Sequence, residues 1–287
     1  MTDLKKKFAE YKRHPGSLCL MLLVMAAAVV TFAVLLFLLG YIFVNGVPNL
    51  SLDLFALEYN SENVSMLPSI INTLVMTVLS LLIAGPLGIF SAIYLTEYAK
   101  KGNKFVNIIR LTTETLSGIP SIVYGLFGAL FFVTALGWGY SLLAGALTLA
   151  IMILPLIMRT TEEALKSVPD MYREGSFGLG AGKLRTVFCV VLPSAIPGIL
   201  SGIILSVGRI VGETAALIYT AGAIPQVPSS LMGSGSTLAV HMYNLSREGL
   251  YMDQAYAVAV VLVILVLFIN WISSTVAKKL TKGKING

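Results

Sequence analysis

A glycine-rich, basic segment, REGSFGLGAGKLRT, lies between two long apolar runs and has residue types that can hold a phosphate group. A nucleotide-binding loop requires Gly, four residues, Gly, Lys and then Ser or Thr, because its backbone N–H groups and lysine hold the phosphates and its hydroxyl holds magnesium. Here Phe177 stands at the first glycine position and Leu184 at the hydroxyl position. The segment therefore does not bind ATP by that mechanism, and we expect no cofactor on this chain.

Two ionisable residues, Arg209 and Glu213, stand four positions apart in another apolar run. On a helix they would lie about 24 and 30 Å beyond Pro193, which places Arg209 near mid-membrane. Arginine costs at least ~2.5 kcal/mol there, so Arg209 is a functional candidate, and its guanidinium fork can hold two oxygens of an anion. Thr214 is small enough for an ion to approach closely. On the same helix face Glu213 would hold Arg209 until an arriving anion displaces it, or would simply neutralise it.

The composition is that of a membrane protein. Hydrophobic residues make up 56% of the 287 residues and charged residues 12%, against roughly 25% charged residues in soluble domains. Six apolar runs are long enough to cross a hydrocarbon core about 30 Å thick, and lipid favours a helix for each. They are Leu18–Val44, Pro68–Thr96, Thr112–Leu136, Ser141–Met158, Leu192–Gly222 and Ala255–Val276. We predict an all-α, polytopic membrane protein with six transmembrane helices.

The basic residues predict the orientation of these spans. Of the 20 Lys and Arg residues, all but Arg209 and Arg247 fall in four segments on one side: the tail 1–17, the connection after the second run, the segment 159–191 and the tail 277–287. The positive-inside rule makes that side cytoplasmic, with both termini inside. Topology thus explains the net charge of +6, and membrane lipid, with no nucleic acid, is the expected surrounding.

Enzyme chemistry finds little support in the sequence. His14 and His241 fall on opposite sides of the predicted membrane, so they cannot share a metal ion. The spans hold no paired carboxylates and no nucleophile beside a base, which leaves no candidate catalytic residue. Glu114 follows Arg110 by four residues, and we expect an exposed ion pair between the two.

The segment 159–191 is the largest surface that the chain offers to another protein. Pro169-Asp170 predicts a helix start within it, because proline suits a first helical turn and an acidic side chain suits the positive helix end. Gly178, Gly180 and Gly182 then bend the chain. These features alone fit either a solvated linker or a knuckle that enters a groove of a partner.

The spacing in this segment resembles the EAA loop of ABC-importer permeases. Glu174-Gly175-Ser176, three residues, Gly180, nine residues and Val190-Val191-Leu192-Pro193 match Glu-Ala-Ala, three residues, Gly, nine residues, Ile, any residue, Leu-Pro. Gly175 and Ser176 replace two alanines, and Val190 replaces isoleucine. The stretches AIYLTEYAKKG, ETLSGIPSIVYGLFG, GRIVGETAALIYTAG and TLAVHMYNLSREG look like phosphate-importer permeases, and the last favours the PstA type.

The resemblance implies a type I ABC importer permease fold over 68–276, after a first helix at 18–44, in the inner membrane of a bacterial cell. It implies a phosphate importer built from this chain, a second permease of the PstC type, two ATPase subunits that hold ATP and Mg, and an external phosphate-binding protein. It assigns contact with the ATPase to Glu174, Gly175, Ser176, Gly180, Leu192 and Pro193. Sulfate or molybdate as cargo, or an ion-coupled secondary transporter, are the alternatives.

Overall fold

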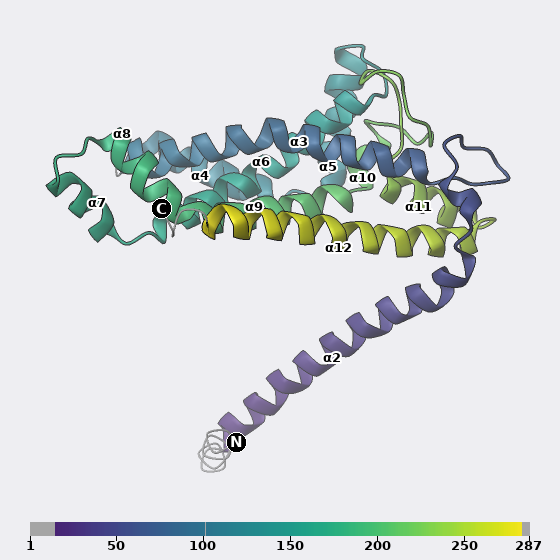
Figure 1. Ribbon diagram of the computed structural model, residues 1–287, viewed down its shortest axis with the longest axis horizontal. Coiled ribbons are helices and arrows are strands. Elements are labelled where there is room, and N and C mark those ends of the chain that lie inside the picture. The colour runs from purple at the N-terminus through teal and green to yellow at the C-terminus, as the bar shows by residue number, and fades with distance from the viewer. Residues whose placement is uncertain (1–14, 101, 283–287) are drawn as a thin grey trace.

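The computed structural model describes residues 15–100 and 102–282. Within these ranges it consists of helices, turns and loops without a strand, so the all-α prediction is confirmed (Figure 1). The long helices are α2 (Pro15–Gly46), α3 (Leu67–Ile93), α6 (Leu142–Lys166), α9 (Leu192–Val211) and α12 (Met252–Lys282). The shorter helices are α4 (Lys104–Ser117), α5 (Ser121–Gly128), α7 (Asp170–Gly178), α8 (Lys183–Thr186), α10 (Ala215–Ile218) and α11 (Leu238–Glu248).

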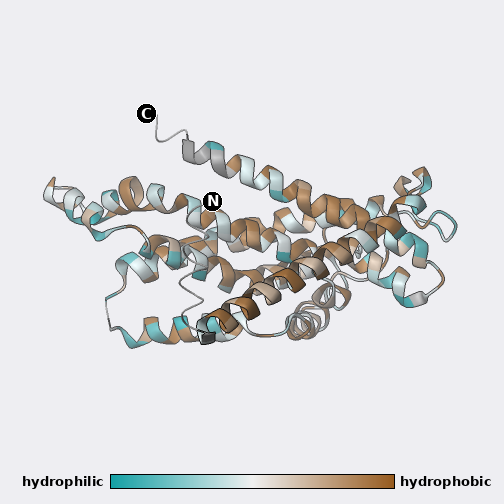
Figure 2. Cartoon of the chain, turned by 90° about the horizontal axis from the view of Figure 1, so that it is seen from below, coloured by the Kyte–Doolittle hydropathy of each residue, from teal (hydrophilic) through white to brown (hydrophobic). Residues whose placement is uncertain are grey.

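The helices form a bundle with apolar flanks. Five continuous helical stretches are long and apolar enough to cross a membrane, and a bent pair supplies a sixth span if it crosses once, as the sequence predicts. Hydrophobic residues fill the middle of the bundle and most of α2, whereas hydrophilic residues gather towards the two ends (Figure 2). This distribution is what a lipid bilayer between two aqueous phases requires.

The third span departs from its predicted limits, Thr112–Leu136, and is interrupted at Gly118 and Pro120, where the sequence carries helix-breaking residues. It begins earlier, at α4, and bends by 102° before α5 and the π turn η4 (Ala129–Ala135). Pro120 causes the break, because it has no N–H to donate and disfavours a helical conformation at the residue before it. The Tyr124 hydroxyl donates to the Leu116 carbonyl oxygen at 2.8 Å, and thereby satisfies a carbonyl beside the break.

The fifth span also departs from its predicted limits, Leu192–Gly222. It runs from Lys183 to Val211 through α8, the π turn η5 (Val187–Val191) and α9. A proline ring displaces the carbonyl of the residue four positions earlier in a helix. For Pro193 that residue is Cys189, which lies in the wider π turn η5. The helix ends at Gly212, before Glu213.

Helix α6 is the centre of the bundle. Two thirds of its most apolar stretch is buried (67%), more than in any other span that the structure describes. Small residues let its neighbours approach closely, because Gly88 of α3 lies against Ile157 and Gly202 of α9 lies against Thr160. Close approach at small residues is how helices pack tightly in lipid, where burial of apolar surface gives no net driving force.

Helix α2 stands apart from this bundle (Figure 1). None of its most apolar stretch is buried within the chain (0%). It meets α12 near its own C-terminal end, where the rings of Tyr41 and Tyr256 lie edge to face at 5.8 Å. The rest of its surface is free to face lipid or another subunit.

The two ends of the bundle carry different structures (Figure 1). Helix α7 lies at the end where α12 finishes, and the opposite end carries α11 and the long connections 47–66 and 222–237. The apolar runs do not predict α11, because this helix is amphipathic and lies in a connection rich in Gly, Pro and Ser.

A buried histidine joins two of these connections. His241 of α11 is 2% exposed, and its Nε2 lies 3.4 Å from the Val64 carbonyl oxygen, which it can reach as a donor. Its ring also lies edge to face against Tyr59, at 5.9 Å between centroids. Val64 has a φ of +45°, a conformation that a β-branched residue adopts only where its surroundings enforce it. Burial lowers the pKa of His241 to about 4.

His241 should make the stability of the protein depend on pH. Its folded pKa of about 4 lies below the ordinary value of 6.5, so the unfolded chain binds the extra proton first as the pH falls. Stability is therefore full above pH 6.5 and decreases towards pH 4, by about 3 kcal/mol in total. The free energy of unfolding in detergent should fall less steeply over this range in His241→Gln, which keeps a donor for Val64. Equal slopes in both proteins would contradict the assignment.

Candidate functional site

Arg209 lies near the middle of the bundle and is half-buried on α9. The next residue, Ile210, packs in the same core cluster as Tyr124 and Ile153. Ile153 lies about 17 Å from the start of α6, a helix of 25 residues that measures about 37 Å. The depth that the sequence predicts for Arg209 thus agrees with its place in the fold.

The guanidinium of Arg209 forms no hydrogen bond or ion pair with any residue that the structure describes. The residue after Arg209, Ile210, shares a core cluster with Tyr124, which closes the break in the third span. An arginine at this depth without an acceptor is costly, and an anion would supply the missing acceptor.

Glu213 does not share a helix with Arg209, so the predicted pairing across one helical turn is absent. The carboxylate is buried, with 8% of the residue exposed. Its Oε1 accepts a hydrogen bond at 3.1 Å from the Ala216 N–H, which belongs to the first turn of α10. Thr214 precedes that helix and is half-buried. Glu213 is therefore held by α10 and leaves Arg209 unneutralised.

Two interrupted spans meet at this level. A Cβ atom on Gly125 of α5 would come within 2.7 Å of the Ala216 Cα of α10, and a Cβ on Gly128 would come within 2.7 Å of the Thr220 side chain. Glycine at both positions lets the bent third span pack against the end of the fifth. Interrupted helices that pair in this way are a common construction for ion and substrate sites in transporters.

At the other end of the bundle α7 and α8 are joined by a short turn, and we call these two helices and their turn the knuckle. Asp170 lies in the first turn of α7, and Gly180 has a φ of +81°, the left-handed region that favours glycine. The Ala181 N–H donates to the Ser176 carbonyl oxygen at 3.1 Å and closes the turn. The Ser176 and Thr186 hydroxyls, 2.9 Å apart, join α7 to α8.

The residues assigned to ATPase contact fall into two groups. Glu174, Gly175, Ser176 and Gly180 lie together on the knuckle. Leu192 and Pro193 lie at the start of α9, where Leu192 packs against a core cluster. The surface of the knuckle is apolar in places, since Met171, Leu179 and Leu184 are 69%, 91% and 66% exposed.

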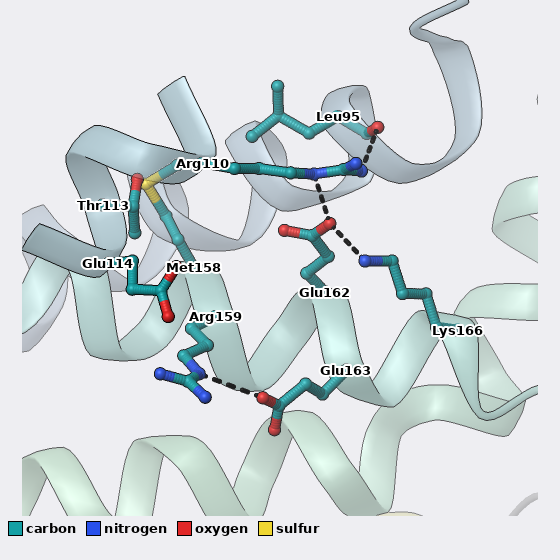
Figure 3. Close-up of a pocket in the computed structure, with 9 residues that line it drawn as sticks. All are labelled: Leu95, Arg110, Thr113, Glu114, Met158, Arg159, Glu162, Glu163 and Lys166. Atoms are coloured by element: carbon teal, nitrogen blue, oxygen red, sulfur yellow. Dashed lines mark hydrogen bonds and ion pairs between the residues drawn. The ribbon is translucent and has the colours of Figure 1, made fainter. Parts of the chain in front are cut away.

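An ion-pair network lies beside the knuckle, around a pocket between α4, α6 and the π turn that follows α3 (Figure 3). Glu162 Oε1 forms ion pairs with Arg110 Nε and Lys166 Nζ, each at 2.7 Å, while Glu163 pairs with Arg159 at 3.0 Å. The predicted pair of Arg110 with Glu114 is therefore wrong. Arg110 points across to α6, and Glu114 faces Arg159 from the far side of the pocket.

A second pair, Arg173 with Glu97, cannot be foreseen from sequence because the two residues stand 76 positions apart. They lie 2.7 Å apart, and their side chains are 15% and 8% exposed. The hydrogen bond to Glu97 raises the pKa of Arg173 above its ordinary value. Within the described residues, no group of His, Cys, Asp and Glu has the arrangement of a metal site.

The family described as "Binding-protein-dependent transport system inner membrane component" matches residues 84–283. The chain belongs to this family. It is a permease subunit of an ABC importer, located in the membrane, and is not an enzyme. This membership excludes the secondary transporter that the sequence leaves open.

The relatives of this permease include proteins named for phosphate. It is 38% identical over 277 residues to the probable ABC transporter permease protein YqgI of Bacillus subtilis, an alignment that covers 88% of this chain and 94% of that one. It is 38% identical over 216 residues to the phosphate transport system permease protein PstA 2 of Mycobacterium bovis, covering 71% of each chain. The PstA protein of Mycobacterium leprae is 35% identical over 201 residues, covering 69% of this chain and 66% of that one.

Solved structures support the fold. A bacterial alginate ABC transporter in complex with its periplasmic protein contains a chain that matches with a TM-score of 0.68 at 16% identity, covering 98% of both chains. A chain of the MetNI methionine ABC transporter in an inward-facing conformation matches with a TM-score of 0.57 at 23% identity, covering 75% of this permease and 93% of that chain. The type I ABC importer permease fold predicted from sequence is confirmed, and these likenesses concern the fold alone.

Proposed function

We propose that this permease imports inorganic phosphate along a path that includes Arg209, Glu213 and Thr214. Support comes from relatives that carry the name phosphate transport system permease protein PstA at 35% and 38% identity. The name YqgI states no cargo, and the two solved structures carry alginate and methionine. Sulfate and molybdate are therefore the competing cargoes to test.

The observation that carries the proposal is the free guanidinium of Arg209 at mid-depth, where two interrupted spans meet. Its planar fork can donate two parallel hydrogen bonds to one tetrahedral oxyanion. Glu213 is fixed by α10, and among the described residues its Oε2 has no hydrogen-bond partner. That oxygen can accept a hydrogen bond from the P–OH group of monohydrogen phosphate, a donor that fully ionised sulfate lacks. Thr214 adds a hydroxyl beside it.

The knuckle is the proposed contact with the ATPase. Its exposed apolar side chains and its left-handed turn at Gly180 give a shaped surface for a groove in another subunit. In this arrangement ATP and Mg are held by two ATPase subunits, a second permease of the PstC type completes the path, and an external phosphate-binding protein meets the opposite end. The alginate transporter, described in complex with its periplasmic protein, offers a parallel for that last contact.

The same arrangement sets the orientation. We place α7 and the end of α12 in the cytoplasm, because 18 of the 20 Lys and Arg residues fall in segments predicted for that side. The connections 47–66 and 222–237 then lie outside the bacterial inner membrane, where the binding protein acts.

The cargo is tested by uptake in cells that lack other high-affinity phosphate importers. The chain, expressed with the second permease, ATPase and binding protein of its own organism, should support uptake of radiolabelled phosphate. A hundredfold excess of sulfate or molybdate should leave the rate unchanged, while unlabelled phosphate should compete fully. Uptake of labelled sulfate or molybdate in place of phosphate would reassign the cargo.

Arg209→Gln should abolish transport without harming assembly. Two charge-assisted hydrogen bonds contribute about 3 kcal/mol or more, so the rate of phosphate uptake should fall at least about 100-fold. The amount of permease in the membrane and the amount of bound ATPase should stay normal, because no described residue relies on the guanidinium for a hydrogen bond.

The double variant Arg209→Gln with Glu213→Gln separates cargo contact from charge balance. The amide oxygen that replaces the carboxylate in Glu213→Gln can still accept from the Ala216 N–H, so the short helix α10 should form. If Arg209 only balanced Glu213, removing both charges would restore uptake, since loss of a whole pair is often nearly neutral. We expect the double variant to assemble and still fail to transport, and robust uptake would remove Arg209 from the path.

Gly180 tests the knuckle. No atom lies within 4 Å of a Cβ built on Gly180, so a substitution acts through the φ of +81°. Gly180→Val should strain the turn and uncouple the complex, with ATP hydrolysis but little phosphate uptake, or with ATPase lost from the membrane. Gly180→Asn is the matched control, because asparagine tolerates the left-handed region, and it should retain most uptake. Normal uptake and normal ATPase retention in Gly180→Val would make this segment a linker.

A further inference from the structure

The pair of Arg173 and Glu97 joins the knuckle to the transmembrane helices. Arg173 is on α7, and Glu97 is on the π turn η3 (Tyr94–Tyr98) that ends α3. Both side chains are shielded from water, in contrast to the pair of Arg159 and Glu163, whose side chains are 57% and 64% exposed. An exposed pair contributes little, whereas breaking a buried pair leaves an uncompensated charge.

All the donors of Arg173 are used. Nη2 donates to Glu97 Oε1 at 2.7 Å and to the Leu165 carbonyl oxygen at 2.9 Å. Nη1 donates to the Val168 carbonyl oxygen at 2.8 Å and to Asp170 Oδ1 at 3.1 Å. Nε completes the fork towards the Glu97 carboxylate at 3.3 Å. One guanidinium therefore binds the end of α3, the last turn of α6 with the connection after it, and the start of α7.

Little else fixes α7 to these helices. The helix has no buried residue, and the hydrogen bond between Ser176 and Thr186 ties its far end to α8. Its position relative to α3 and α6 therefore depends on Arg173 far more than on apolar packing.

Helix α3 continues this connection to the opposite end of the bundle. Its first turns hold the connection 222–237, because the Ser69 and Ser236 hydroxyls lie 2.9 Å apart and Asn72 Nδ2 donates to the Gln226 carbonyl oxygen at 2.8 Å. The Thr73 hydroxyl accepts from the Leu238 N–H at 2.8 Å, at the start of α11. Along its length α3 packs on α6, where the Ser80 hydroxyl donates to the Ala146 carbonyl oxygen at 3.0 Å.

We propose that Arg173 and Glu97 form the joint through which a displacement of α7 is passed to α3 and α6, and from α3 to the connection 222–237. The two are positioning residues for transport and touch neither cargo nor nucleotide. This proposal rests on the proposed docking of the ATPase at the knuckle. The guanidinium of Arg173, bonded to Glu97 and to two backbone carbonyls, would pass on the movement of α7. It takes the place of apolar packing between α7 and the transmembrane helices.

The test measures phosphate transported per ATP hydrolysed in vesicles that contain the whole complex. The wild-type complex first establishes the cargo and the ratio. Arg173→Lys keeps the charge but loses the fork, and Glu97→Gln keeps the shape but loses the charge. We expect both variants to retain ATP hydrolysis while the transport ratio falls at least about fivefold, within the range that coupling changes produce. Glu163→Gln, at the exposed pair, is the matched control and should change neither quantity.

A merely structural role gives a different result. Poor folding would reduce ATP hydrolysis and uptake together and leave their ratio at the wild-type value, and that outcome would overturn the proposal. If a single variant fails to assemble because it strands a charge, the double variant Glu97→Gln with Arg173→Gln removes both charges. It should assemble and remain uncoupled, and a wild-type ratio in that protein would also overturn the joint.

The two proposals fail in distinguishable ways. If Gly180→Val keeps its bound ATPase and normal uptake, the knuckle is not the docking site. No ATPase movement would then reach Arg173 and Glu97 through α7. If Gly180→Val is uncoupled but Arg173→Lys and Glu97→Gln transport at the wild-type ratio, docking stands and the joint alone is wrong.

Discussion

The need to satisfy every backbone hydrogen-bonding group inside a lipid bilayer shapes this permease. Continuous helices meet most of this need, and four spans, α2, α3, α6 and α12, are of that kind. The helices of the third and fifth spans are interrupted. At each interruption a side chain bonds a backbone group. The Tyr124 hydroxyl bonds a carbonyl before the first break, and the Glu213 carboxylate caps the helix after the second. Because irregular backbone is tolerated only where protein or a polar cavity surrounds it, the two breaks pack against each other.

This arrangement explains how a charged residue can be retained inside the membrane. An arginine on an unbroken, lipid-facing helix would be expensive. Arg209 instead lies in the last turn of α9, where Gly208 and Gly212 flank it in the chain and its neighbour Ile210 packs in the same core cluster as Tyr124. The same irregularity that a bilayer penalises thus provides a place where a charged side chain can be retained.

The sequence predicts what depends on local chemistry. Apolar runs predict the spans, Pro169-Asp170 predicts the start of α7, and glycine spacing predicts the turn at Gly180. Arg110 shows where such reasoning stops, because its nearest acid in the sequence is Glu114 but its partner in space is Glu162. The pair of Arg173 and Glu97 and the contact of α5 with α10 depend in the same way on packing between distant segments. The early end of the fifth helix is hidden for another reason, since the apolar run resumes at Ala215 after Glu213 and Thr214, and hydropathy therefore predicts one span through this point.

Helix α2 packs little against the rest of the chain, so its sequence can change in related proteins with little effect on the bundle. The family match begins at residue 84, beyond α2, and the most apolar stretch of α2 has no buried residue. A substitution on its outer surface therefore changes no core packing in the bundle, provided that the helix stays apolar. Lipid and neighbouring subunits become its main selective environment. Permeases with nearly the same bundle can consequently carry unrelated first helices, each matched to a different assembly.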